Sequence, residues 1–90
     1  MNNKQELLDL INLINKSEKM SLIDDILFQE ILTNSALLLA LSDDALADEF
    51  SVSLPTVTRW KNGKNVPYSI AKNLIYYRLK KLAFAQLQKE

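Results

Sequence analysis

The chain has 90 residues and a formal net charge of zero, and 48% of its residues are apolar, with one glycine, two prolines and neither cysteine nor histidine. This composition argues against a disordered or β-rich chain, and the length gives one domain whose core lies near the lower limit for independent stability. Without cysteine or histidine the chain lacks disulfides, thiolate zinc sites and the commonest general base, so we expect no enzyme activity, no metal ion and no cofactor.

The first twenty residues begin with an amphipathic segment. Residues 3–16 place Leu7, Leu10, Ile11 and Ile14 on one helical stripe, which Leu8 and Leu13 widen, and a polar break is expected at residues 16–19. Because so small a domain has little surface to cover a wide stripe, we interpret residues 1–20 as a candidate for dimerisation or partner contact, preceding a domain over residues 21–90. The long apolar helix expected from Ile70 to Leu87 is the alternative dimer contact. The chain shows no signal-peptide pattern and no run of about 20 apolar residues, which favours a soluble cytoplasmic protein.

One longer helix is expected on each side of the middle of the chain. Ser21 and Asp24 form an S-x-x-D capping pattern, and apolar residues follow at helical spacing: Ile23, Ile26, Leu27, Ile31 and Leu32. Residues 33–35 either interrupt this helix before the apolar run 36–41 or lie within it, and the pattern allows both. A last helix begins near Ser69, just past Pro67, and ends near Gln86; Tyr76 and Tyr77 are expected to divide between core and surface.

Residues 42–67, SDDALADEFSVSLPTVTRWKNGKNVP, have the spacing of a helix-turn-helix motif. Ser42 and Ser53 are N-cap residues, and Gly63 follows a second helix expected over residues 54–62. Small or apolar residues occupy the positions at which the two helices cross: Leu46, Ala47, Phe50, Val52, Val57 and Trp60. At 100° per residue Val57 and Trp60 share one face of the second helix, so the opposite face points outward. The pattern predicts that this outward face meets the major groove of DNA.

The stretch LADEFSVSLPTVTRWKNGKNVP resembles the phage repressor and Cro family of XRE-type helix-turn-helix proteins, over about 45 of the 90 residues including the flanking helices. The resemblance implies an all-α, five-helix (or six-helix), lambda-repressor-like domain with an extra N-terminal helix, which binds a two-fold operator as a dimer. The residues that it implies face bases are Leu54, Pro55, Thr58 and Arg59. Those that it implies contact phosphates are Ser53, Thr56, Lys61, Asn62 and Lys64.

Two positions depart from the family pattern. Ser51 stands where the family usually has glycine, in a turn position that favours a positive φ and costs about 1 to 2 kcal/mol for other residues. Asp43 and Asp44 stand where the family tends to have an uncharged donor to phosphate. These carboxylates favour the helix dipole but repel a DNA backbone, which weakens the prediction of a phosphate clamp from that side.

Acidic and basic residues are separated along the chain. Residues 1–50 hold three lysines and ten carboxylates, a net charge of −7, whereas residues 51–90 hold eight lysines or arginines and one glutamate, a net charge of +7. A basic half predicts a nucleic-acid surface with about 4 to 6 phosphate contacts per monomer. The alternative is a helical protein whose charges pair across its surface.

We therefore expect a sequence-specific, double-stranded-DNA-binding transcriptional regulator of phage, plasmid or bacterial origin, associated with the nucleoid and acting as a homodimer. The alternative is an antitoxin-like or adaptor protein-interaction module, in which the acidic N-terminal half binds a basic protein partner and DNA binding is weak or absent.

Overall fold

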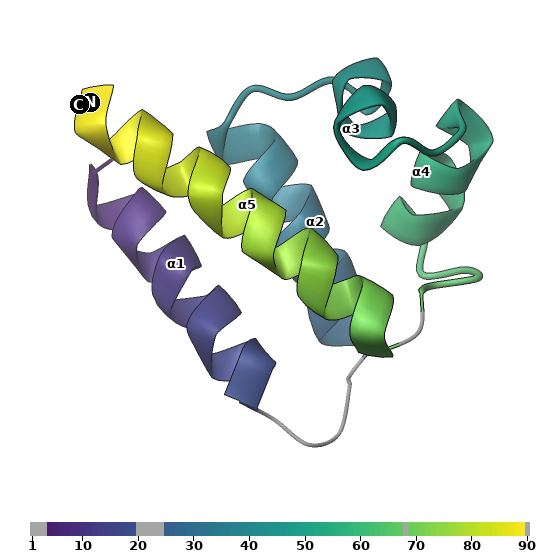
Figure 1. Ribbon diagram of the computed structural model, residues 1–90, viewed down its shortest axis with the longest axis horizontal. Coiled ribbons are helices and arrows are strands. Elements are labelled where there is room, and N and C mark those ends of the chain that lie inside the picture. The colour runs from purple at the N-terminus through teal and green to yellow at the C-terminus, as the bar shows by residue number, and fades with distance from the viewer. Residues whose placement is uncertain (1–3, 20–24, 68, 90) are drawn as a thin grey trace.

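The computed structural model describes residues 4–19, 25–67 and 69–89, and these residues form five helices and the turns between them. They are α1 (Lys4–Lys19), α2 (Asp25–Leu38), α3 (Asp43–Phe50), α4 (Leu54–Lys61) and α5 (Ser69–Lys89), and these ranges contain no strand (Figure 1). The prediction of an all-α, five-helix fold is confirmed. The cap predicted at Ser21 and Asp24 lies outside the described residues.

The long helices α1, α2 and α5 form a frame in which α1 packs against both α5 and α2 (Figure 1). The apolar stripe of α1 faces inward: Leu7 and Ile14 are fully buried, and Leu10 and Ile11 are nearly so. These side chains belong to the same core as the rest of the chain. The stripe that suggested a dimer contact is therefore covered within the monomer, and only Leu8, 37% exposed, lies at the surface.

One helix is longer than the sequence pattern predicted, and another resolves an alternative that the pattern left open. α1 continues through the polar residues at 16–19, where Ser17 Oγ donates to the Leu13 carbonyl (3.0 Å) and Glu18 pairs with Lys80 of α5 (2.6 Å). α2 runs without a break through residues 33–35, where Thr33 Oγ1 donates to the Gln29 carbonyl within the helix (2.9 Å). Polar residues at these places thus continue the helix and do not interrupt it.

α2 ends in a tight turn that sends the chain into α3. Ala40 has a φ of 53°, and Leu41 N–H donates to the Ala36 carbonyl (2.9 Å), which closes the end of the helix. The axes of α2 and α3 are bent by 114° relative to each other. Among the described helices none is by itself long and apolar enough to cross a membrane; α2 and α3 reach that composition only as this bent pair.

Phe28 of α2 lies at the centre of the core and contacts two other helices through their aromatic rings. Its ring is fully buried, 6.0 Å between centroids from Trp60 of α4 in an edge-to-face arrangement and 5.8 Å from Tyr76 of α5. Tyr76 is 2% exposed and Tyr77 is 53% exposed, so the predicted division of the two tyrosines is confirmed. This aromatic cluster, Phe28, Trp60 and Tyr76, joins the short helix α4 to the frame.

We predict that Trp60→Ala lowers the free energy of unfolding by about 3 to 5 kcal/mol, because a buried indole would leave a cavity against Phe28. Urea denaturation followed by circular dichroism measures the loss. The control is Leu37→Ala at a side chain that is 81% exposed, which should change stability by less than about 0.5 kcal/mol. Equal losses in the two variants would contradict the central place of the aromatic cluster.

Candidate nucleic-acid interface

The helices α3 and α4 have eight residues each and are joined by the three-residue turn 51–53. Ser42 Oγ accepts from Ala45 N–H (3.1 Å) and caps α3, and Ser53 Oγ accepts from Thr56 N–H (3.3 Å) and caps α4. Ser51 has φ 55° and ψ 44°, the left-handed conformation expected at this position, and Val52 N–H donates to the Ala47 carbonyl (2.9 Å). Two helices joined by so short a turn are typical of the helix-turn-helix motif.

The inward side of the motif consists of small and apolar side chains. Leu46 and Val57 are fully buried, and Ala47 and Trp60 are 8% and 7% exposed. Phe50 and Val52 are half-buried and pack against the core. The structure thus brings together the six residues that the spacing assigned to the crossing of the two helices.

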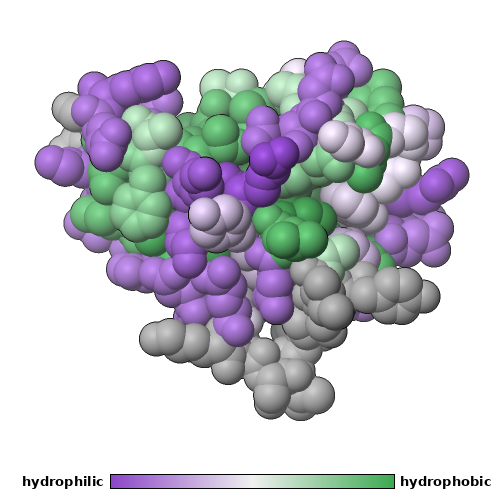
Figure 2. Space-filling model, viewed as in Figure 1, coloured by the Kyte–Doolittle hydropathy of each residue, from purple (hydrophilic) through white to green (hydrophobic). Residues whose placement is uncertain are grey.

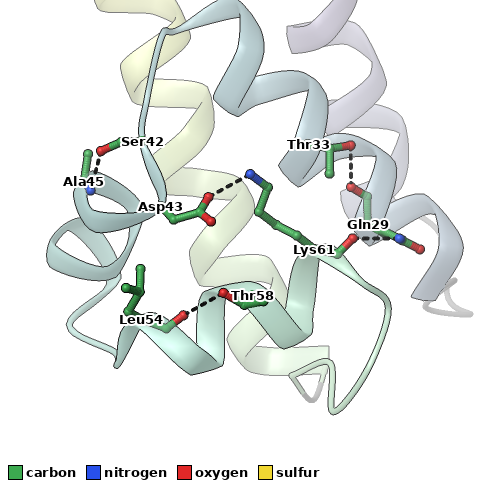
Figure 3. Close-up of polar contacts among 8 residues, drawn as sticks. All are labelled: Gln29, Thr33, Ser42, Asp43, Ala45, Leu54, Thr58 and Lys61. Carbon is green, nitrogen blue, oxygen red and sulfur yellow. Dashed lines mark hydrogen bonds and ion pairs between the residues drawn. The ribbon is translucent and has the colours of Figure 1, made fainter.

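The outward face of α4 carries the four residues proposed to face bases. Leu54 is 44% exposed, and Pro55, Thr58 and Arg59 are exposed as well. Thr58 Oγ1 donates to the Leu54 carbonyl of its own helix (3.2 Å), which leaves the hydroxyl oxygen as an acceptor (Figure 3). Arg59 makes no ion pair with any described carboxylate. An exposed guanidinium on this face has the geometry to donate two hydrogen bonds to the edge of a guanine.

The residues proposed to contact phosphates differ in their exposure and in their hydrogen-bond partners. Ser53, Asn62 and Lys64 are exposed, whereas Thr56 and Lys61 are half-buried. Thr56 Oγ1 lies 2.8 Å from Ser53 Oγ. Lys61 extends toward α3, where its Nζ donates to Asp43 Oδ1 (2.7 Å; Figure 3). Lys61 can therefore contact a phosphate only if its ion pair with Asp43 breaks.

The end of α4 is held in place by a residue that the sequence pattern did not single out. Gln29 of α2 donates from its amide nitrogen to the Lys61 carbonyl (2.7 Å; Figure 3). Gly63 follows with φ 74°, and a Cβ at that position would come within 2.9 Å of Gln29 Oε1. Lys64 N–H then donates to the Arg59 carbonyl (2.7 Å). No local pattern reveals this contact, because the two partners are 32 residues apart.

The charges of the two halves of the chain pair with each other in the fold. Four basic residues of the second half contact carboxylates of the first half: Lys61 with Asp43 (2.7 Å), Lys72 with Asp25, Arg78 with Glu49 (3.7 Å) and Lys80 with Glu18 (2.6 Å). Four of the eight basic residues in the second half therefore form ion pairs with the first half, as expected for a helical protein whose charges pair across its surface. Near α4, Arg59 and Lys64 are the exposed cations without an ion pair among the described residues, and Asp44 and Asp48 of α3 are exposed carboxylates.

Comparisons of the chain with protein-family models, with curated proteins and with solved structures found no match. The resemblance to the repressor and Cro family therefore stays a prediction from the residues of the motif.

The strained residue of the turn gives a direct test of the motif geometry. Ser51 is exposed, so substitutions there act mainly through the backbone. We predict that Ser51→Gly leaves the free energy of unfolding unchanged or raises it by up to about 1 kcal/mol, because glycine adopts a positive φ without strain. Ser51→Val should lower it by about 1 to 2 kcal/mol, with Ser51→Ala as the control for the hydroxyl. A Ser51→Gly variant less stable than Ser51→Val, by thermal denaturation, would show that the turn has another conformation.

Proposed function

We propose that the protein binds double-stranded DNA sequence-specifically as a transcriptional regulator, with α4 in the major groove. The observation that carries this proposal is the division of α4 into a buried side, Val57 and Trp60, and an exposed side that presents Arg59 without an ion pair among the described residues. The major groove of B-DNA, about 12 Å wide, admits one α-helix. The resemblance of the motif to phage repressors supports the same function.

The distribution of charges favours a small number of phosphate contacts. Lys72 and Lys80 are paired within the frame, Lys72 being only 3% exposed, and they add little to an interface formed by α4. Lys64 and Lys61 remain near α4 as cations for phosphate, and Lys61 is paired with Asp43 in the free protein. We therefore propose about one or two ion pairs with phosphate per monomer in place of the larger number suggested by the charge of the basic half.

A second candidate function rests on a groove between α1 and α2. It has a volume of about 470 Å³, its apolar wall includes Leu13 and Leu37, and Glu6 and Asp9 lie on its rim. Leu37 is 81% exposed there. An apolar groove beside carboxylates suits a basic amphipathic helix, as expected of an antitoxin-like or adaptor module. Absence of DNA binding at low salt would favour this candidate.

We predict that substitutions of Arg59 and Lys64 separate recognition of sequence from attraction to phosphate. Arg59→Ala should weaken binding to the preferred site by about 1 to 3 kcal/mol while changing binding to random duplex much less, because its guanidinium reads a base edge. Lys64→Ala should weaken both kinds of binding together. Fluorescence anisotropy with a duplex selected from a random pool and with random duplex measures both. An unchanged ratio of the two affinities in Arg59→Ala, with the fold intact by circular dichroism, would contradict the placement of α4 in the groove.

We predict further that the logarithm of DNA affinity falls with the logarithm of salt concentration with a slope of about −1 to −2 per monomer. Asp43→Asn should strengthen binding and steepen this slope by up to about one, because it removes the carboxylate that competes for Lys61. Glu18→Gln is the matched control, since it breaks the pair with Lys80 away from α4. Equal effects of the two substitutions would mean that only the total charge matters and that Lys61 does not contact phosphate.

A further inference from the structure

A groove lies between the α3–α4 turn and the first half of α5. It has a volume of about 540 Å³, within the range of about 300 to 1,000 Å³ that is typical of small-molecule sites. Trp60 and Ile75, which are 7% and 6% exposed, form the buried part of its lining, and the half-buried Phe50 and Val52 belong to one wall. Figure 2 shows green hydrophobic surface interrupted by purple hydrophilic surface over α5. Because Trp60 lies on the inward side of α4, this groove is separate from the face proposed to meet DNA.

Two side chains of opposite charge, Glu49 of α3 and Arg78 of α5, are the only charged groups that line the groove in the described part of the chain. Arg78 Nε lies 3.7 Å from Glu49 Oε1, which is longer than the 2.7 to 3.2 Å typical of a hydrogen bond. Neither side chain hydrogen-bonds to another described residue. The guanidinium therefore retains its donors for a carboxylate, and the carboxylate of Glu49 retains its acceptors for an ammonium group.

We propose that this groove binds an aromatic α-amino acid, with its carboxylate on Arg78, its ammonium group on Glu49 and its ring on the apolar lining. The two charges of an α-amino acid are carried by groups bonded to one carbon atom, so they lie close together, as Arg78 and Glu49 do. A ligand with a carboxylate alone would bring that group beside Glu49, and a ligand with an ammonium group alone would bring it beside Arg78. Like charges repel in both cases, whereas a zwitterion gives each side chain a partner of opposite sign.

The lining of the groove favours an aromatic ligand over an aliphatic one. Three of the lining residues carry rings, Phe50, Trp60 and Tyr77, and aromatic rings attract each other in edge-to-face or offset arrangements beyond the effect of buried area. Tyr77 is 53% exposed, and Lys81 Nζ lies 5.5 Å from the centroid of its ring, a cation–π contact that restrains it. A benzene, phenol or indole ring in the groove would therefore meet rings that are already held in place.

The position of the groove also gives the ligand a means of regulating the motif. A bound amino acid would contact both the α3–α4 turn and Trp60, the two features that set the orientation of α4. By joining them to α5, the ligand would hold α4 in place before DNA binds, and such preorganisation strengthens binding. The ligand site itself does not depend on DNA binding, but this regulatory effect rests on the proposed function.

An NMR titration of the full chain without DNA tests the site, with L-tryptophan as the probe. We expect saturable changes centred on the amides of residues 49–52 and 71–78, and a dissociation constant of about 1 mM or lower. Indole-3-propionate lacks the ammonium group and tryptamine lacks the carboxylate, so each should bind about tenfold more weakly or worse. Equal affinity for the three probes, or no binding of L-tryptophan at about 10 mM, would overturn the proposal.

Two substitutions assign the two charges of the ligand. Arg78→Gln should weaken the binding of L-tryptophan about tenfold and strengthen that of tryptamine, because it removes the partner of the carboxylate and a charge that repels the ammonium group. Glu49→Gln should weaken L-tryptophan by a similar factor and strengthen indole-3-propionate. Both substitutions break only an exposed ion pair, so the fold is retained. Lys89→Gln, at the exposed end of the same helix, is the matched control and should leave the affinity unchanged. Wild-type affinity for L-tryptophan in Arg78→Gln, or an equal loss in Lys89→Gln, would overturn the assignment.

The regulatory effect is measured by fluorescence anisotropy with the selected duplex, with and without saturating L-tryptophan. We expect the ligand to strengthen DNA binding by about fivefold or more in the wild-type chain and much less in Arg78→Gln. Unchanged DNA affinity with the ligand bound would overturn the regulatory effect. A chain that binds L-tryptophan in the groove but binds no DNA at low salt would contradict the proposed function and leave the ligand site standing.

Discussion

The packing of Phe28 against Trp60 is the contact on which the arrangement of the motif depends. α3 and α4 have eight residues each, and isolated helices of this length are not stable in water. Their stability must come from packing, and the edge-to-face contact at 6.0 Å joins α4 to the buried ring at the centre of the frame. With Trp60 held inside, Arg59 is turned outward. The bond from Gln29 to the Lys61 carbonyl then fixes the end of the same helix. The face that α4 offers to a ligand is thus a consequence of how the core is packed.

Pairing between the two halves of the chain changes what its charge distribution means. A sequence with −7 in one half and +7 in the other describes a dipolar chain, but four pairs bring these charges together across the fold. Asp43 is the clearest example of such a pair. It lies at the start of α3 and binds Lys61, a lysine that is expected to contact DNA. A regulator of this kind would gain specificity from a few contacts of α4 and little from long-range attraction. Because each copy would make few contacts, the affinity for DNA would then depend on the association of two copies.

Periodicity in the sequence identified the features that depend on neighbouring residues. The spacing of Leu7, Leu10, Ile11 and Ile14 identified a buried face, and Ser42 and Ser53 marked the starts of α3 and α4. The spacing could not tell whether the first stripe is covered by the chain itself or by a partner, because that depends on where α5 packs. Nor could it reveal that Gln29 bonds to the Lys61 carbonyl or that Lys80 pairs with Glu18, since both contacts join distant parts of the chain.

The central claim is that the exposed face of α4 is the surface that meets DNA. It is tested most directly by titrating isotope-labelled protein with duplex selected from a random pool and following backbone amide resonances by NMR. We expect the largest changes on residues 53–64, with smaller ones at the start of α3. Changes concentrated in the groove between α1 and α2, or no changes at low salt, would contradict it.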